Sequence, residues 1–104
     1  MERYKVQLSN QAKNDYKGII RYIKYQLLEP VIAEKYAELI KNELNSLAYQ
    51  PQKFAVIDYD IIKKYNFRKL IIKNYIAFYR INEDEKIVNV ERILYNGTDW
   101  KNKL

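Results

Sequence analysis

The amino-acid sequence predicts an α+β domain of order β-α-α-β-β-β, in which an N-terminal helical hairpin packs on one face of a twisted antiparallel sheet. Three observations predict this class. Two stretches repeat apolar residues every three or four positions, a short alternating segment precedes them, and three β-rich runs separated by turn residues follow. With 104 residues, the chain can bury one hydrophobic core, so we expect a single domain over residues 1–104.

The first predicted strand covers residues 4–8, where apolar and polar residues alternate as in a half-buried strand. Ser9 or Asn10 then offers a side-chain oxygen suited to a helix N-cap. The helix that follows is predicted to end before Pro30, because the residue before a proline disfavours the helical conformation. Its apolar stripe consists of Ala12, Tyr16, Ile19, Ile23 and Leu27.

A second helix is predicted from about Pro30 to just before Pro51, since proline is accepted in the first turn of a helix but not in its interior. The two helices therefore form an antiparallel hairpin. Residues 52–65 have no regular period, and we expect an ordered loop there with one helical turn. The apolar stripe of the second helix consists of Ala33, Tyr36, Ala37, Ile40, Leu44, Leu47 and Ala48.

The last three strands are predicted at residues 67–72, 75–81 and 87–94, which are rich in β-branched and aromatic residues. Residues 73–74 (Lys-Asn) suit a two-residue hairpin turn, and the polar stretch 82–86 makes the next turn. This part of the chain therefore forms a meander of antiparallel strands.

The last strand has one irregularity. Its period of two breaks once, which predicts a β-bulge near Glu91 and Arg92. Because both helices are expected on one side of the sheet, the other face is predicted to remain comparatively open.

Composition excludes several classes of site. The chain has neither cysteine nor histidine, so thiolate nucleophiles, zinc ribbons and the usual general base near neutral pH are missing, and no cofactor or metal is expected. Nineteen Lys and Arg residues against thirteen Asp and Glu residues give a formal net charge of +6, which favours a polyanionic partner. Nothing resembles a signal peptide or a membrane span, so we expect a cytoplasmic protein.

Several local strings occur in an order typical of one family. They include the start of the first helix at residues 9–16 (SNQAKNDY) and the end of the second helix at residues 47–51 (LAYQP). The most specific strings are residues 67–70 (FRKL), 75–81 (YIAFYRI) and 88–95 (VNVERILY). Together they resemble the RelE/ParE superfamily, the toxins of bacterial type II toxin–antitoxin (plasmid stabilisation) systems, over essentially the whole chain.

The resemblance implies one of two activities. In the ribonuclease (RelE) branch, cations stabilise the transition state while another group moves the 2′-OH proton of messenger RNA in the ribosome. The residues that would serve as such a catalytic set are Arg68, Lys69, Arg92 and Tyr95. Many relatives of that branch carry an arginine at the position of Ile76, however, and relatives of both branches carry histidine at the position of Tyr95.

The missing arginine favours the ParE branch, whose members inhibit DNA gyrase and need a complementary surface but no catalytic constellation. On this interpretation the protein is not an enzyme, and exposed aromatic and arginine side chains are interface anchors. The expected residues for binding a target or an antitoxin are Tyr75, Arg80, Arg68, Arg92 and Trp100. A third alternative is a degenerate binding module that has lost its toxicity.

Each of these residues also has a structural interpretation. Arg92 would form a salt bridge to a carboxylate such as one close to Glu91 or Asp99. Tyr75 and Tyr79 would pack in the core with their hydroxyl groups at its rim, and Trp100 would cap the core. The resemblance further implies a partner, since the antitoxin of such a pair typically wraps the toxin with an acidic segment that folds on binding. We therefore expect an acidic antitoxin and a toxin–antitoxin hetero-oligomer.

Overall fold

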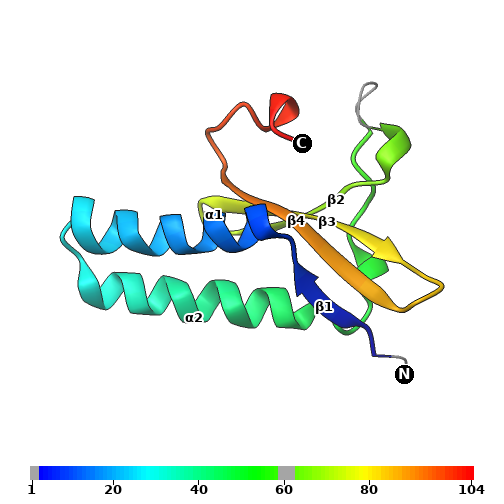
Figure 1. Cartoon of the computed structure of the whole chain (residues 1–104), viewed down its shortest axis with the longest axis horizontal. Helices are drawn as coiled ribbons and strands as arrows, with labels where there is room; N and C mark the ends of the chain where they lie inside the picture. Colours follow the sequence, from blue (N-terminus) through cyan, green and yellow to red (C-terminus); the bar gives the residue numbers. More distant parts are fainter. Residues whose placement is uncertain (1–2, 59–62) are drawn as a thin grey trace.

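The computed structural model describes residues 3–58 and 63–104 and has the predicted element order (Figure 1). Two long helices lie side by side and project from one side of a twisted sheet of four strands. The main elements are β1 (Lys5–Leu8), α1 (Asn10–Arg21), α2 (Pro30–Ser46), β2 (Arg68–Ile72), β3 (Tyr75–Asn82) and β4 (Ile87–Tyr95). In the described part of the chain, no helix is long and apolar enough to cross a membrane.

Helix α1 begins as its sequence predicts. The Ser9 hydroxyl accepts a hydrogen bond of 3.0 Å from the backbone N–H of Ala12, so Ser9 is the N-cap. After Arg21 the helix continues as a π-helical segment, Tyr22–Gln26, and the chain then turns at Leu28, which has a positive φ of 55°. The single helix predicted up to Pro30 is therefore an α-helix extended by a wider turn.

Helix α2 starts at Pro30, as predicted, but ends at Ser46, several residues before the predicted end near Pro51. The chain tightens after Ser46, because the N–H groups of Leu47 and Ala48 each bond to a carbonyl three residues earlier. Gln50 then adopts the left-handed conformation, with φ 52°, and a short 3-10 turn follows at Pro51–Lys53. The predicted loop at 52–65 contains a second 3-10 turn at Lys63–Tyr65, and its residues 59–62 lie outside the described residues.

The strand order is β1-β4-β3-β2, and the sheet is mixed, so the prediction of a purely antiparallel sheet was wrong at one pairing. Strand β1 runs parallel to β4, while β2–β3 and β3–β4 are antiparallel. The helical hairpin brings the chain back to the start of β1, where the N–H of Tyr4 bonds to the carbonyl of Ala48 at 2.8 Å. Strand β2 therefore takes the direction of β1, and so does β4 after two reversals.

The predicted bulge is confirmed. Phe78 pairs with Arg92 but Tyr79 pairs with Val90, which leaves Glu91 as the extra residue of β4. The bulge changes the alternation of β4, so Val90 and Ile93 both face the helices although they are three positions apart.

Hydrophobic residues are buried on both faces of the sheet. The larger cluster lies between the sheet and the helical hairpin and includes Ile40, Leu47, Tyr79 and Val90. The second cluster lies on the other face, where the C-terminal segment packs through Trp100 and Leu104 against residues such as Phe78. This face, expected to be comparatively open, is therefore partly covered.

Tyr79 fastens the loop after α2 to the sheet. Its side chain is fully buried, as the core-packing interpretation predicts, and its hydroxyl donates a hydrogen bond of 2.7 Å to the carbonyl of Pro51. Burial raises the pKa of the Tyr79 phenol to about 12, and the nearby Arg68 only partly offsets this rise.

The raised pKa predicts a specific loss of stability in alkali. The folded state holds the Tyr79 proton up to about pH 12, whereas the unfolded chain releases it near pH 10. The stability that this proton contributes is therefore complete below pH 10 and is lost as the pH rises through 12. By pH 11 the loss amounts to about 1 kcal/mol. Chemical denaturation at pH 8 and pH 11 should show a smaller alkaline loss for Tyr79→Phe than for the wild type; an identical loss would contradict the assignment.

Candidate functional site

An open groove runs between the helical hairpin and the ends of β3 and β4. Its volume is about 760 Å³, and its lining is mostly aliphatic and aromatic. Helix α1 supplies Gly18 and Ile19, α2 supplies Ile32 and Tyr36, and the sheet supplies Ile93, among others. We call this feature the hairpin groove.

Four tyrosines line the hairpin groove: Tyr22, Tyr36, Tyr75 and Tyr95. The Tyr75 ring lies edge-on between those of Tyr36 and Tyr95, with centroid separations of 5.9 Å to each. Burial raises the pKa of the Tyr75 phenol, and the neighbouring phenols add to the rise. Tyr75 therefore stays protonated near neutral pH and is a hydrogen-bond donor, not a base.

Gly18 opens the wall of the groove on α1. A Cβ atom added there would meet no atom within 4 Å, so core packing does not require a glycine. Glycine inside a helix costs roughly 0.5–1 kcal/mol relative to alanine. An unfavourable residue that faces an empty, apolar groove leaves room for a partner to approach the helix backbone closely.

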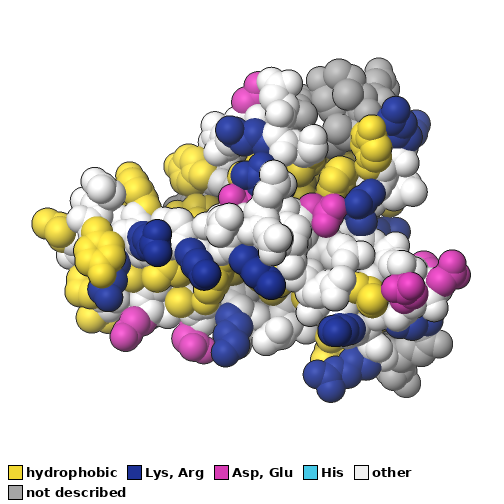
Figure 2. All heavy atoms as spheres, in the orientation of Figure 1, with side chains coloured by type: hydrophobic (Ala, Val, Ile, Leu, Met, Phe, Trp, Pro, Cys, Tyr) yellow, Lys and Arg dark blue, Asp and Glu magenta, His cyan; other side chains and the backbone are white. Residues whose placement is uncertain are grey.

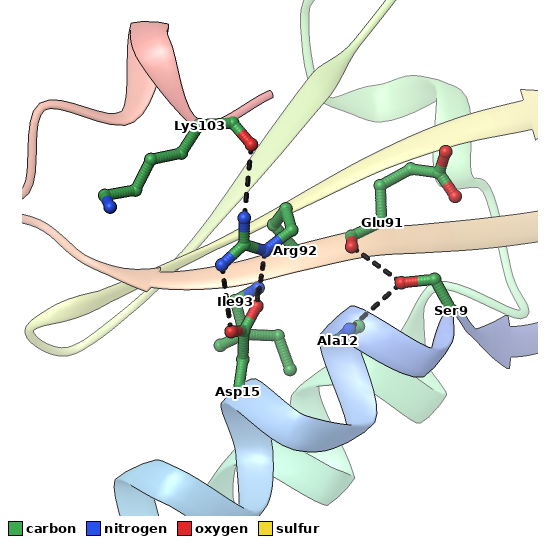
Figure 3. A network of polar contacts seen from close by, with 7 residues as sticks. All are labelled: Ser9, Ala12, Asp15, Glu91, Arg92, Ile93 and Lys103. Carbon is green, nitrogen blue, oxygen red and sulfur yellow. Dashed lines mark hydrogen bonds and ion pairs between the residues drawn. The ribbon is translucent and has the colours of Figure 1, made fainter.

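Arg92 and Asp15 form an ion pair between β4 and α1 (Figure 3). The guanidinium donates two hydrogen bonds, of 2.8 and 3.1 Å, to the two carboxylate oxygens of Asp15. A third donor of Arg92 reaches the backbone carbonyl of Lys103 at 3.1 Å. Hydrogen bonding to Asp15 raises the pKa of Arg92. Arg92 thus forms the salt bridge proposed for it, but its partner is Asp15 and not Asp99.

Arg68 is occupied by backbone carbonyl groups. Its guanidinium donates to the carbonyl of Gln52 at 3.1 Å and also to the carbonyl of Phe54. It lies on the helix-covered face of the sheet, since it pairs with Tyr79 across β2 and β3. These bonds hold the loop after α2 against the edge strand.

Lys69 and Trp100 lie on the opposite face. Trp100 packs on Phe78 with ring centroids 5.1 Å apart, and the Lys69 ammonium lies 5.9 Å from the centroid of the Trp100 ring. Trp100 therefore caps the second cluster, as its structural interpretation predicts. Lys69 and Arg92 both pair with Phe78 from the neighbouring strands, so they flank this aromatic pair.

Arg80 is further along the same face. It donates a hydrogen bond of 2.9 Å to the carboxylate of Glu91 and stacks over the Phe67 ring at 5.4 Å. Its side chain is 44 % exposed, more than twice the value for Arg92. Arg80 is therefore available to a partner in a way that Arg92 is not.

Residues 6–100 match the model of the ParE toxin of the type II toxin–antitoxin system parDE. The chain belongs to the ParE toxin family. It is a toxin of the RelE/ParE superfamily, as the sequence strings predict. No curated protein matches the sequence.

Three solved structures have the same fold as this ParE-family chain. A chromosomal ParDE system from P. aeruginosa superposes with a TM-score of 0.73 at 18% identity, covering 89% of this chain and 96% of the other. The RelBE2 complex from Mycobacterium tuberculosis gives 0.63 at 17% identity, covering 94% and 97%. An archaeal RelE–RelB complex from Pyrococcus horikoshii gives 0.62 at 14% identity, covering 91% and 97%.

The ParE-family fold separates the residues of the expected catalytic set. Arg68 lies on the helix-covered face, whereas Lys69 and Arg92 lie on the face capped by Trp100. Tyr95 lies in the hairpin groove and pairs with Tyr75, whereas Arg68 pairs with Tyr79. Tyr75 and Tyr79 are four residues apart on β3, so about 13 Å along the strand separates Tyr95 from Arg68. The set does not converge on one reacting atom.

Sequence reasoning missed Asp15, Tyr22 and Tyr36. Tyr36 belongs to the apolar stripe of α2, so its period predicted burial and gave no sign of a groove. Asp15 was one of several charges on α1. The one signal for it was its place in the family-like string of residues 9–16, and that string did not indicate its partner.

The ion pair predicts which arginine supports the fold. Arg92→Ala should lower the free energy of unfolding by about 3 kcal/mol, because the partly buried Asp15 carboxylate loses its cation. Arg92→Lys should be intermediate, since lysine lacks the bidentate geometry. Arg80→Ala is the matched control and should cost less than about 1 kcal/mol. Urea denaturation measures all three, and equal losses at both positions would refute this ranking.

Proposed function

We propose that this ParE-family toxin arrests growth by binding DNA gyrase in the cytoplasm and not by cutting RNA. The observation that carries the proposal is the state of the expected catalytic residues. Arg68 and Arg92 donate to partners within the protein, and the remaining members lie on different faces. A surface that recognises a protein needs no convergent cations, whereas stabilising a phosphorane-like transition state does.

The tyrosines support the same proposal. The raised pKa of Tyr75 makes it a poor proton acceptor near neutral pH, and the chain has no histidine to replace it. Exposed tyrosine and arginine side chains are, by contrast, common anchors of protein interfaces. Tyr95 and Arg80 are suited to that role, because Tyr95 is exposed and Arg80 is partly exposed.

We further propose that the toxin is held inactive by an acidic antitoxin whose amphipathic segment occupies the hairpin groove. The apolar lining would take the apolar side chains of that segment, and the phenol groups would donate to its carboxylates. The net charge of +6 favours an acidic partner. The open wall at Gly18 would let the backbone of the segment approach α1.

The target assignment is tested with two parallel assays on the purified toxin. Gyrase and supercoiled DNA should yield trapped cleavage complexes, while messenger RNA in a translating extract should remain intact. Lys69→Ala should act like the wild type in both assays, because Lys69 is part of the nuclease set only. Ribosome-dependent cuts without an effect on gyrase would establish the RelE-like activity instead. A toxin inactive in both assays, from a gene that does not arrest growth, would indicate a degenerate binding module.

The antitoxin site is tested with Gly18→Leu. Leucine should stabilise α1 and also fill the groove, so the variant should fold and remain toxic but bind the antitoxin roughly 10- to 100-fold more weakly, a loss of about 1.4–2.8 kcal/mol. The titrant is the proposed acidic antitoxin, and calorimetry measures its affinity. Asn42→Leu, on the exposed side of α2, is the control. Equal affinities for both variants would place the antitoxin elsewhere.

A further inference from the structure

Helix α1 and the π-helical segment that follows it carry an uncompensated row of positive charge. Its members are spaced by four, four and three residues, so they share one side of the helix over about 16 Å. All are exposed, and Figure 2 shows a row of Lys and Arg side chains along the hairpin. We call Lys13, Lys17, Arg21 and Lys24 the basic row.

The described part of the chain provides the row with no counter-ion. Among the described residues, no carboxylate lies within salt-bridge distance of any member. The acidic residue of α1 itself, Asp15, is bound to Arg92. The charge of the row is therefore presented entirely to the solvent.

This arrangement is unfavourable for the isolated protein. Like charges at (i, i+4) destabilise a helix by about 0.2–0.5 kcal/mol per pair, and α1 contains two such pairs, Lys13–Lys17 and Lys17–Arg21. The first turn of α1 also lacks the acidic residue that would favour the helix dipole. Helix α2 provides the contrast, because Lys35 and Lys41 alternate there with Glu34, Glu38 and Glu43. Solubility alone would be served by the mixed pattern of α2.

The basic row is separate from the hairpin groove. At 100° per residue, the centre of the row lies about 100° around the helix from the centre of the groove-lining residues Asn14, Gly18 and Tyr22. An acidic peptide that buries apolar side chains would be accommodated by the groove. On the exposed side of the helix the row offers spaced cations without an apolar furrow, which matches a chain of phosphates.

The chemistry at the end of the row fits the same ligand. Tyr25 is 63% exposed, and the Lys24 ammonium lies 5.3 Å from its ring centroid. Exposed aromatic rings beside cations are typical of surfaces on which nucleic-acid bases stack. We propose that the outer side of α1 binds the phosphate backbone of a nucleic acid, independently of the target and antitoxin sites.

Fluorescence anisotropy with labelled 20-nucleotide probes tests the proposal, using single-stranded DNA, single-stranded RNA and duplex DNA. Contact with about four phosphates predicts that affinity falls roughly 50- to 150-fold between 50 and 200 mM salt. The double variant K17Q/R21Q should bind at least about ten-fold more weakly at 50 mM salt, and its log–log salt slope should fall by about two. The probe bound best identifies the type of nucleic acid.

The double variant K35Q/K41Q is the matched control, because it removes the same charge from the exposed surface of α2. It should bind within about three-fold of the wild type. Thermal unfolding at low salt should show K17Q/R21Q to be at least as stable as the wild type, which separates lost binding from lost folding. Equal weakening by both double variants, no binding of any probe, or displacement of the probe by an equally charged polyglutamate at equal or lower concentration would each overturn the proposal.

Discussion

The attachment of α1 to the bulge of β4 is the contact on which the rest of the structure depends. Three successive residues of β4 take part: the carbonyl of Glu91 accepts from Ser9, while Arg92 and the N–H of Ile93 both donate to Asp15. Neighbouring side chains of a regular strand point to opposite faces of the sheet. The extra residue Glu91 disturbs this alternation, so the Arg92 side chain and the Ile93 backbone N–H can both bond to Asp15. The junction fixes one wall of the hairpin groove and also anchors the last residues of the chain through Lys103.

The same junction explains why the arginines of the sheet do not converge on one point. A guanidinium on a strand is costly to bury without a planar anionic partner, and Arg92 meets that requirement with Asp15. Arg68 meets it with two carbonyl groups of the neighbouring loop. The positive charge left to the solvent lies mainly elsewhere, including the outer side of α1. In this chain Arg68 and Arg92 therefore stabilise the contacts of the sheet with its neighbouring elements.

Local patterns predicted the elements well, because helix caps, apolar stripes and turn residues act over a few positions. Ser9, the residues 73–74 turn and the irregularity at Glu91 were all readable in this way. The parallel pairing of β1 with β4 was not, since it depends on where the hairpin returns the chain. The site was harder still. Asp15 and Arg92 are 77 residues apart, and nothing in either local string indicates that they meet. The groove-lining Tyr36 has the same helical period as a core residue.

The parallel pairing of β1 with β4 also has a consequence for how the protein is made. The two strands are far apart in sequence, as the hydrogen bond between Gln7 and Asn89, 82 residues apart, illustrates. Non-local strand pairing slows folding and must await the synthesis of the later strand. A nascent chain that has exposed only β1 and the helical hairpin has neither the completed sheet nor the sheet wall of the groove. The folded toxin therefore arises only after β4 has been synthesised, when a separately synthesised binding partner can already be present.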